Sequence, residues 1–117
     1  MSLSYYHNPN CSKSRAGLGL LEQSGQAFNC ILYLDITLKS AELLHIAKNY
    51  PGELKDLLRE KELKEAGFSL EALTETQFVN WVQKTPKCLQ RPLLVSDETV
   101  CIGRPVENLL VFLESVR

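Results

Sequence analysis

Cys11 is the residue best placed to do chemistry in this chain. It lies in a polar stretch, residues 7–15, between a short aromatic run that ends at Tyr6 and a leucine-bearing run, residues 16–24, that ends at Gly25. The first run predicts a strand and the second a helix. Cys11 is therefore expected at a strand-to-helix turn, where unpaired N–H groups and the helix dipole favour a thiolate and a bound oxyanion.

Three neighbours of Cys11 are candidates for stabilising its thiolate or binding a substrate. A free thiol with a pKa of ~8.5 is only a few per cent ionised at neutral pH, whereas helix N-termini and cations lower the pKa to ~3.5–7.5. Ser14, in the pattern Cys-x-x-Ser, could donate its hydroxyl to the sulfur or be an ordinary first-turn residue. His7 and Arg15 could add positive charge or hydrogen bonds, although His7 fits a plain strand end equally well.

Three arginines stand at predicted element ends rather than on helix faces. Arg59 follows a pair of leucines, whereas Arg91 and Arg104 each precede a proline, which restricts the arginine to extended conformations. Any one of them alone fits a solvated surface charge. Together with a thiol at a helix start they indicate a site for a dianion, because arginine offers planar, bidentate donors.

The other cysteines have spacings that argue against a zinc knuckle and against a Cys-x-x-Cys dithiol. Cys30 and Cys101 occupy strand-like runs, so we expect them to be small buried apolar residues. Cys88 lies in a loop-like stretch and could be exposed, which leaves it as the one candidate for a second, resolving thiol. All four cysteines are expected to be free thiols in a reducing cytosol.

Composition limits the classes of protein that are possible. The chain has 117 residues, 44% of them hydrophobic, and 13 basic against 14 acidic residues give a net charge of -1. This length and hydrophobic content are enough for one modest core. A net charge close to zero gives no overall electrostatic attraction to nucleic acid or to a membrane. No apolar run approaches the ~20 residues that span a bilayer, and the start of the chain lacks a signal-peptide pattern. We expect a cytoplasmic monomer.

Hydrophobic spacing and turn residues predict the remaining elements in order. These are a strand over 28–34; a helix capped by Ser40 that ends before Pro51; a surface helix from Glu53 to Glu65, ended by Gly67; a helix with a capping box at Thr74 and Gln77, closed before Pro86; strands over 93–95 and 99–102 joined by an Asp97-Glu98 turn; and a helix from Val106 to Val116, with Pro105 in its first turn and Leu109, Leu110 and Leu113 facing inward. The middle third of the chain is thus expected to be helical.

This order predicts an α/β fold in a single domain, residues 1–117. A βαβ half and a ββα half would form one four-stranded mixed sheet flanked by helices, with a helical insert over about residues 40–85 between the halves. The strand and helix order is that of thioredoxin-like domains.

Several motifs together resemble one family of thioredoxin-like proteins. They are Tyr6-His7-Asn8-Pro9-x-Cys11-x-x-Ser14-Arg15, Leu32-Tyr33-Leu34, Leu57-Leu58-Arg59, Arg91-Pro92-Leu93-Leu94-Val95 and Gly103-Arg104-Pro105-x-Glu107. Their order over nearly the whole chain is similar to that of the glutaredoxin-coupled arsenate reductase family. The resemblance implies Cys11 as the nucleophile, Arg59, Arg91 and Arg104 as an oxyanion clamp, and Pro92 as the cis-proline opposite the active cysteine.

The function implied by this resemblance is the reduction of arsenate, or a similar oxyanion, to arsenite. The Cys11 thiolate would attack arsenate held by the arginines and displace water. Because Ser14 stands where a second cysteine would be, electrons must come from outside, from glutathione as co-substrate and from glutaredoxin, with no metal or bound cofactor.

Two other functions remain open. Cys11 could serve as the monothiol of a glutathione-dependent thiol-disulfide oxidoreductase, with the arginines binding glutathione carboxylates. Alternatively, the chain could be a non-enzymatic regulator of the same fold that binds RNA polymerase. Ser14 and the three arginines count against the regulator, which would not need an oxyanion clamp.

Overall fold

The computed structural model describes residues 2–65, 67 and 73–116, and the chain divides into two compact units. Unit 1 comprises Met1–Tyr33 and Arg91–Arg117, and unit 2 comprises Leu34–Gln90. The helical insert expected over residues 40–85 falls within unit 2, and the assignment of the whole chain to one domain stays a prediction.

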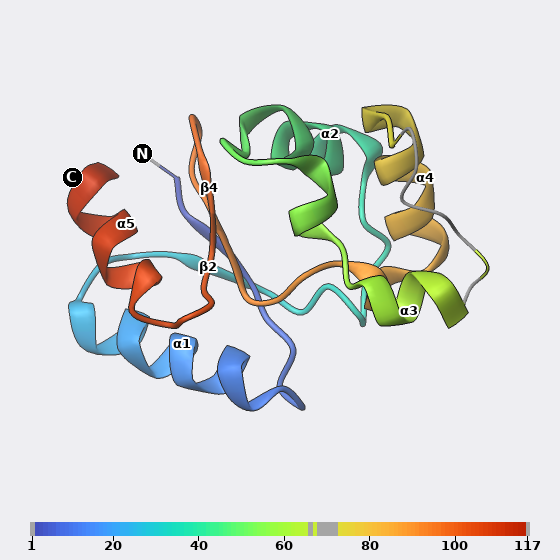
Figure 1. Ribbon diagram of the computed structural model, residues 1–117. Helices are drawn as coiled ribbons and strands as arrows, with labels where there is room; N and C mark the ends of the chain where they lie inside the picture. The colour runs from blue at the N-terminus through green and yellow to red at the C-terminus, as the bar shows by residue number, and fades with distance from the viewer. Residues whose placement is uncertain (1, 66, 68–72, 117) are drawn as a thin grey trace. The chain divides into compact units, whose positions relative to one another are not determined.

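Unit 1 contains the sheet. Its strands are β1 (Ser4–Tyr6), β2 (Asn29–Ile31), β3 (Leu93–Val95) and β4 (Val100–Ile102). Their order is β2-β1-β3-β4, with β1 and β2 parallel and the other two pairs antiparallel. Figure 1 labels the two edge strands, β2 and β4. The predicted four-stranded mixed sheet is confirmed, and the α/β architecture with it. Strand β3 has its predicted bounds, whereas β2 and β4 are shorter than the runs over 28–34 and 99–102 that predicted them.

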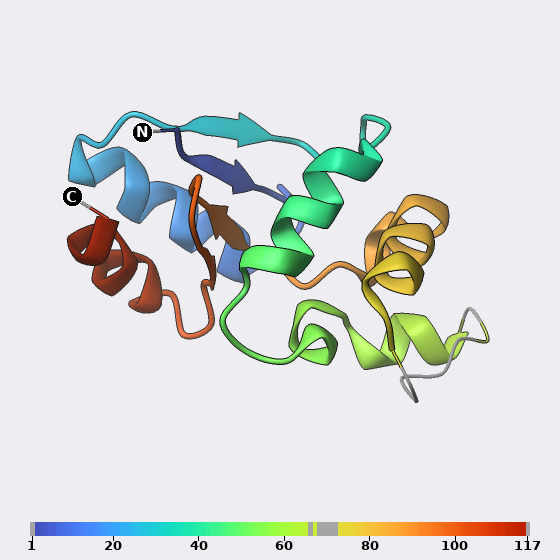
Figure 2. The same ribbon diagram turned by 90° about the horizontal axis from the view of Figure 1, so that it is seen from above.

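Two helices of unit 1, α1 (Ser12–Ser24) and α5 (Asn108–Val116), lie side by side next to the sheet (Figure 2). Alternate residues of a strand share one face, so Leu3 and Tyr5 point to the same side of β1. They form a core with helix residues and with one residue of β3: Leu21, Leu94, Leu109, Phe112 and Leu113. Burying such a side chain fully contributes about 1.5–3 kcal/mol, which is the main attraction between sheet and helices.

Helix α1 begins four residues before the leucine-bearing run from which it was predicted. Cys11 is its N-cap residue, in extended conformation, and Gly25 ends the helix with a φ of 74° as expected of a C-terminal glycine. Inside the helix, a Cβ on Gly17 would collide with the Tyr5 hydroxyl. Gly17 therefore lets α1 approach β1 closely, just after the turn that carries Cys11.

Helix α5 differs from its prediction at two points. It begins at Asn108 rather than at Val106, and the carbonyl of Pro105 accepts a hydrogen bond from the Asn108 N–H at 3.0 Å. Leu109 is buried as predicted, whereas Leu110 is 41% exposed, so its inward assignment was wrong. The reason is helical spacing, because the buried face follows residues three and four apart and Leu110 lies off that stripe.

Unit 2 is helical, as the sequence predicted for the middle third. Its elements are α2 (Ser40–Asn49), the 3₁₀ helix η1 (Leu54–Leu57), α3 (Glu60–Glu65), α4 (Glu75–Lys84) and the 3₁₀ helix η2 (Pro86–Cys88). Helices α2 and α4 pack on each other. The capping box of α4 is confirmed, since Gln77 N–H donates to Thr74 Oγ1 and Thr74 N–H donates to Gln77 Oε1, both at 3.1 Å.

Two predictions for unit 2 were wrong in detail. Ser40 is the first residue of α2 and Lys39 is the N-cap residue, whose N–H donates to the Glu42 carboxylate at 2.7 Å. The helix expected from Glu53 to Glu65 is broken into η1 and α3. At the break, Leu58 is extended and bridges to Leu89, and both leucines are buried. Because Leu58 is buried and extended in this bridge, residues 53–65 cannot form one continuous surface helix.

Candidate active site

Cys11 lies half-exposed at the start of α1, directly after the turn that follows β1. Its φ and ψ are -103° and 122°, and its carbonyl accepts the hydrogen bond from Arg15 N–H at 3.0 Å. Its own N–H donates to the carbonyl of Asn8 at 3.0 Å. These two bonds fix the backbone on both sides of the thiol, so the sulfur stands over the first N–H groups of the helix, as the sequence predicted.

The surroundings of the thiol favour its ionised form. Burial raises the pKa of Cys11, but this effect is outweighed by hydrogen bonds from the backbone of Ser14, from the side chain of Arg91 and from the backbone of Lys13, and by the charge of Arg91. The pKa of Cys11 therefore lies below its ordinary value. A thiolate is the nucleophilic form of cysteine, so the site is suited to nucleophilic attack.

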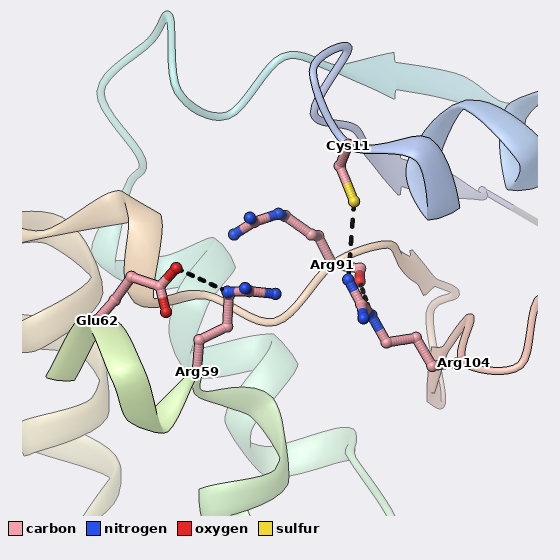
Figure 3. Close-up of polar contacts among 5 residues, drawn as sticks. All are labelled: Cys11, Arg59, Glu62, Arg91 and Arg104. Atoms are coloured by element: carbon pink, nitrogen blue, oxygen red, sulfur yellow. Dashed lines mark hydrogen bonds and ion pairs between the residues drawn. The ribbon is translucent and has the colours of Figure 1, made fainter. Parts of the chain in front are cut away.

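Arg104 reaches Cys11 from the loop between β4 and α5. Its Nη2 lies 3.7 Å from Cys11 Sγ, and its Nε donates to the carbonyl of Arg91 at 2.6 Å (Figure 3). The guanidinium is thus held at one edge by main chain while another nitrogen faces the sulfur. Two of the three predicted arginines, Arg91 and Arg104, thus lie near the thiol, although both are more than 75 positions from Cys11 in the sequence.

The loop that carries Arg91 is tied to the loop that carries Arg104. The Gly103 N–H donates to the carbonyl of Pro92 at 2.9 Å. The peptide bond between Arg91 and Pro92 is cis, in keeping with the resemblance, and the bond between Arg104 and Pro105 is also cis, which the sequence did not suggest. Both arginines that face the thiol therefore precede a cis-proline.

Ser14 acts on the thiol through its backbone rather than through its hydroxyl. The Ser14 side chain is fully buried, its Oγ lies 2.7 Å from His7 Nδ1, and it accepts a hydrogen bond from Asn8 N–H at 2.9 Å. Its carbonyl accepts one from the Tyr5 hydroxyl at 2.7 Å. The hydroxyl thus joins the end of β1 to α1, and the predicted donation from Ser14 to the sulfur comes from its N–H instead.

His7 and Arg15 have separate roles in the same turn. His7 is buried and its ring stacks on Tyr5, with centroids 5.7 Å apart. Burial first, and then the charge of Arg15, lower the pKa of His7, which favours a neutral imidazole. The exposed Arg15 donates from Nη1 to the carbonyl of Pro9 at 2.7 Å. Both residues therefore stabilise the turn that presents Cys11.

Arg59 belongs to unit 2 and has a partner that the sequence analysis missed. Its Nε donates to Oε1 of Glu62 at 2.9 Å, and its N–H donates to the carbonyl of Cys88 at 2.6 Å. The signal in the sequence was the i, i+3 spacing of opposite charges at the start of a helix. Arg59 is thereby tied to the segment that runs into Arg91 along the chain.

The other three cysteines differ from their predictions in exposure. Cys30 is exposed and Cys101 is only half-buried, so neither is the fully buried apolar residue that was expected. Cys88, which could have been exposed, is fully buried in η2, and burial raises its pKa to about 12. Such a thiol is neither accessible nor ionised at neutral pH, so the structure argues against Cys88 as a resolving cysteine.

The arrangement of the described residues bears on two further possibilities, a metal site and a membrane-spanning helix. Within residues 2–65, 67 and 73–116, no group of three or more His, Cys, Asp or Glu side chains is arranged to hold a metal ion. In the same part of the chain, no helix has the length and apolarity needed to cross a membrane.

A cysteine at the N-terminus of the helix that follows the first strand of a β2-β1-β3-β4 sheet, with a cis-proline directly before β3, defines a thioredoxin-like protein. The model of the ArsC family matches residues 6–112, and the chain belongs to this family.

Named relatives cover almost the whole chain. An arsenate reductase of Neisseria meningitidis serogroup A is 34% identical over 107 residues, which are 89% of this chain and 92% of the relative. The uncharacterized protein YfgD of Escherichia coli K12 is 35% identical over 108 residues, 90% of this chain and 91% of that one. The solved structure of an arsenate reductase from Vibrio cholerae superposes with a TM-score of 0.82 at 33% identity, covering 95% of this chain and 97% of the other.

Proposed function

We propose that this protein reduces arsenate to arsenite, with Cys11 as the nucleophile and with glutathione and glutaredoxin as the source of electrons. The observation that carries the proposal is the pairing of a helix-N-terminal thiol with a fixed guanidinium, Arg104 Nη2 at 3.7 Å from Cys11 Sγ. Relatives of similar length are named arsenate reductase, which agrees with an oxyanion as the substrate.

In the first step, the Cys11 thiolate attacks the arsenic atom of arsenate. An S–As bond forms, one As–O bond breaks, and the departing oxygen takes up protons and leaves as water. Arg91 and Arg104 donate hydrogen bonds to the remaining oxygens, where negative charge is concentrated. The Arg104 guanidinium is held by the Arg91 carbonyl before substrate arrives, so it needs little reorganisation during the reaction.

In the second step, a glutathione thiolate attacks Sγ of the arsenylated Cys11. A disulfide forms between Cys11 and glutathione, and the electron pair of the S–As bond stays on arsenic, which goes from As(V) to As(III) and leaves as arsenite. A glutaredoxin thiolate then takes glutathione from Cys11 by disulfide exchange and restores the free thiol. No metal or bound cofactor takes part.

Arg59 completes the proposed clamp. Its support is the resemblance of Leu57-Leu58-Arg59 to the family motif and its hydrogen bond to Cys88, three residues before Arg91 in the chain. His7, Ser14, Arg15 and Pro92 hold the thiol turn and the arginine loop. The proposal places this reaction in the cytoplasm, in a monomer that binds neither nucleic acid nor membrane, since glutathione and glutaredoxin act in a reducing compartment.

A coupled assay tests the function. The purified chain is mixed with arsenate, glutathione, glutaredoxin, glutathione reductase and NADPH, and the loss of NADPH absorbance is followed. We expect arsenate-dependent NADPH oxidation that requires glutaredoxin and is abolished by Cys11→Ser, whereas Cys88→Ser retains it. Activity that survives Cys11→Ser would contradict the nucleophile.

The same preparation separates the two other functions. Reduction of a small mixed disulfide of glutathione, with no arsenate turnover, would indicate the thiol-disulfide oxidoreductase. Recovery of RNA polymerase in a pull-down, with neither activity, would indicate the regulator.

A further inference from the structure

We infer that Glu62 is a positioning residue for Arg59 and selects which edge of the Arg59 guanidinium meets the oxyanion. This inference rests on the proposed function, in which Arg59 is part of the clamp. Within unit 2 the observation is direct, because Arg59 Nε and Glu62 Oε1 are 2.9 Å apart (Figure 3).

The pair is less accessible to water than a neighbouring ion pair within α3. The Arg59 and Glu62 side chains are 24% and 17% exposed, whereas those of Lys64 and Glu60, which lie 3.1 Å apart, are 73% and 63% exposed. Exposed pairs contribute little because water and salt screen them, while partly buried pairs are screened much less. The Arg59–Glu62 contact is therefore strong enough to restrict a side chain, and Glu60 provides a matched control.

The backbone around the pair is already fixed. The Arg59 N–H donates to the carbonyl of Cys88 at 2.6 Å, and the Arg59 carbonyl accepts from Leu63 N–H at 3.1 Å. What remains variable is the long side chain of Arg59, and arginine carries about 2 kcal/mol of rotamer entropy. By accepting the hydrogen bond from Nε, Glu62 restricts the rotamers of Arg59 before any ligand binds.

The contact also decides which donors Arg59 offers. A guanidinium can meet an oxyanion through Nε and one terminal nitrogen, or through the two terminal nitrogens. Glu62 occupies Nε, and the rest of the guanidinium points away from Glu62 (Figure 3). The presented edge is thus the fork of Nη1 and Nη2, whose two coplanar donors match two oxygens of a tetrahedral oxyanion.

Charge and orientation make opposite predictions for Glu62. Its negative charge opposes a nearby anion, so if Glu62 acted only through charge, every substitution would tighten oxyanion binding. If it orients Arg59, a side chain without an acceptor for Nε weakens binding. Glu62→Gln keeps an acceptor and removes the charge, so it should bind oxyanions as well as the natural protein or better.

The experiment measures oxyanion binding with and without turnover. The first readout is the concentration of arsenate or sulfate that half-protects Cys11 from alkylation by iodoacetamide, and the second is KM and kcat for arsenate. The variants are Glu62→Ala, Glu62→Gln, Arg59→Ala, the double variant Arg59→Ala with Glu62→Ala, and the control Glu60→Ala. Thermal unfolding checks each, and Glu62→Met, which keeps the length of the side chain, replaces Glu62→Ala if that variant is unfolded.

We expect Glu62→Ala to raise the half-protecting concentration and KM about tenfold, as for the loss of a charged hydrogen bond, with a much smaller change in kcat. Glu60→Ala should change neither. In the Arg59→Ala background, the Glu62 substitution should have no further effect, since a residue that acts only through Arg59 has nothing left to position.

Other outcomes would overturn the inference. Additive effects in the double variant, or Glu62→Gln as weak as Glu62→Ala, would show that Glu62 does not orient Arg59. An Arg59→Ala variant with unchanged protection would remove both Arg59 and Glu62 from the site, while turnover by Cys11 stood. Protection with the expected pattern but no arsenate turnover would contradict the proposed function alone.

Discussion

The side-chain oxygen of Ser14 lies 2.7 Å from Nδ1 of His7, and both side chains are buried. Because Asn8 N–H donates to the same oxygen at 2.9 Å, one hydroxyl connects the residues after β1 with the first turn of α1. This hydroxyl therefore stabilises the turn that carries Cys11.

Ser14→Ala should destabilise the fold. The substitution leaves His7 and the N–H of Asn8 without their buried partner, which we expect to lower the free energy of unfolding by about 1–3 kcal/mol. Urea denaturation monitored by circular dichroism measures this. Ser12→Ala is the matched control, since Ser12 is exposed in the same turn and should change stability by less than about 0.5 kcal/mol. Equal effects of the two variants would contradict the structural role of the Ser14 hydroxyl.

His7 should make the protein less stable in mild acid. Burial, and then the charge of Arg15, lower the pKa of His7 below 6.5 in the folded chain. On acidification the unfolded chain binds a proton near that pH while the folded chain does not, so the free energy of unfolding falls from pH 6.5 downward to the folded pKa. Denaturant midpoints between about pH 6.5 and 5 should therefore fall less steeply in His7→Gln than in the natural protein. Parallel curves would show that His7 titrates normally.

Cys11 should be alkylated at lower pH than an ordinary thiol. Hydrogen bonds to the sulfur and nearby positive charge outweigh burial and lower its pKa, so the rate of reaction with iodoacetamide should reach its plateau below the pH typical of free cysteine. Arg104→Ala removes the guanidinium 3.7 Å from Sγ and should shift this profile to higher pH. Lys13→Ala keeps the N–H that faces the sulfur and serves as the control, with an unchanged profile.

The four cysteines should react in a defined order. At neutral pH, Cys11 should be modified first. Cys30 should react more slowly although the residue is exposed, because partial burial of its thiol and the charge of Glu22 raise the pKa of Cys30. Burial raises the pKa of Cys101 to about 11 and that of Cys88 to about 12, so both should follow, Cys88 only on unfolding. Peptide mapping by mass spectrometry after timed alkylation measures the order, and early labelling of Cys88 would contradict its burial.

Two glycines of α1 should respond oppositely to the same substitution. Gly17→Ala would place a methyl group against the Tyr5 hydroxyl and 2.8 Å from Leu109 Cδ1, which should cost about 1–3 kcal/mol as overpacking. A methyl group on Gly19 meets no atom within 4 Å among the described residues, so Gly19→Ala should stabilise the helix by up to about 1 kcal/mol. Thermal unfolding distinguishes the two, and equal shifts would contradict the close approach of α1 to β1.

The sequence was sufficient for the sheet and for most helices because their signals are local. Short apolar runs of β-forming residues and the turn residues beside them predicted the strands, and the Thr74 capping box predicted the start of α4. The interruption at Leu58 was not predictable in the same way. The interruption depends on a bridge to Leu89, 31 positions away, and no local sequence pattern indicates such a partner.

The candidate site was only partly accessible from the sequence. The types and order of Cys11, Arg91 and Arg104 indicated a thiol with cations, and the structure brings these three together. The Ser14 hydroxyl bonds to His7 and to the N–H of Asn8, so the N–H of Ser14 faces the sulfur instead. The sequence does not show that these groups are close together. The partner of Arg59 was visible as a spacing of charges, but that spacing is common on helix surfaces, where such pairs contribute little.

Arg104 is held through its Nε by the main-chain carbonyl of Arg91. Every residue type has that carbonyl, so a change of side chain at position 91 leaves the anchor of Arg104 in place. A substitution at position 91 would therefore remove one of the two guanidinium groups near Cys11, and with it part of what lowers the pKa of the thiol, while the anchor of the other guanidinium would remain.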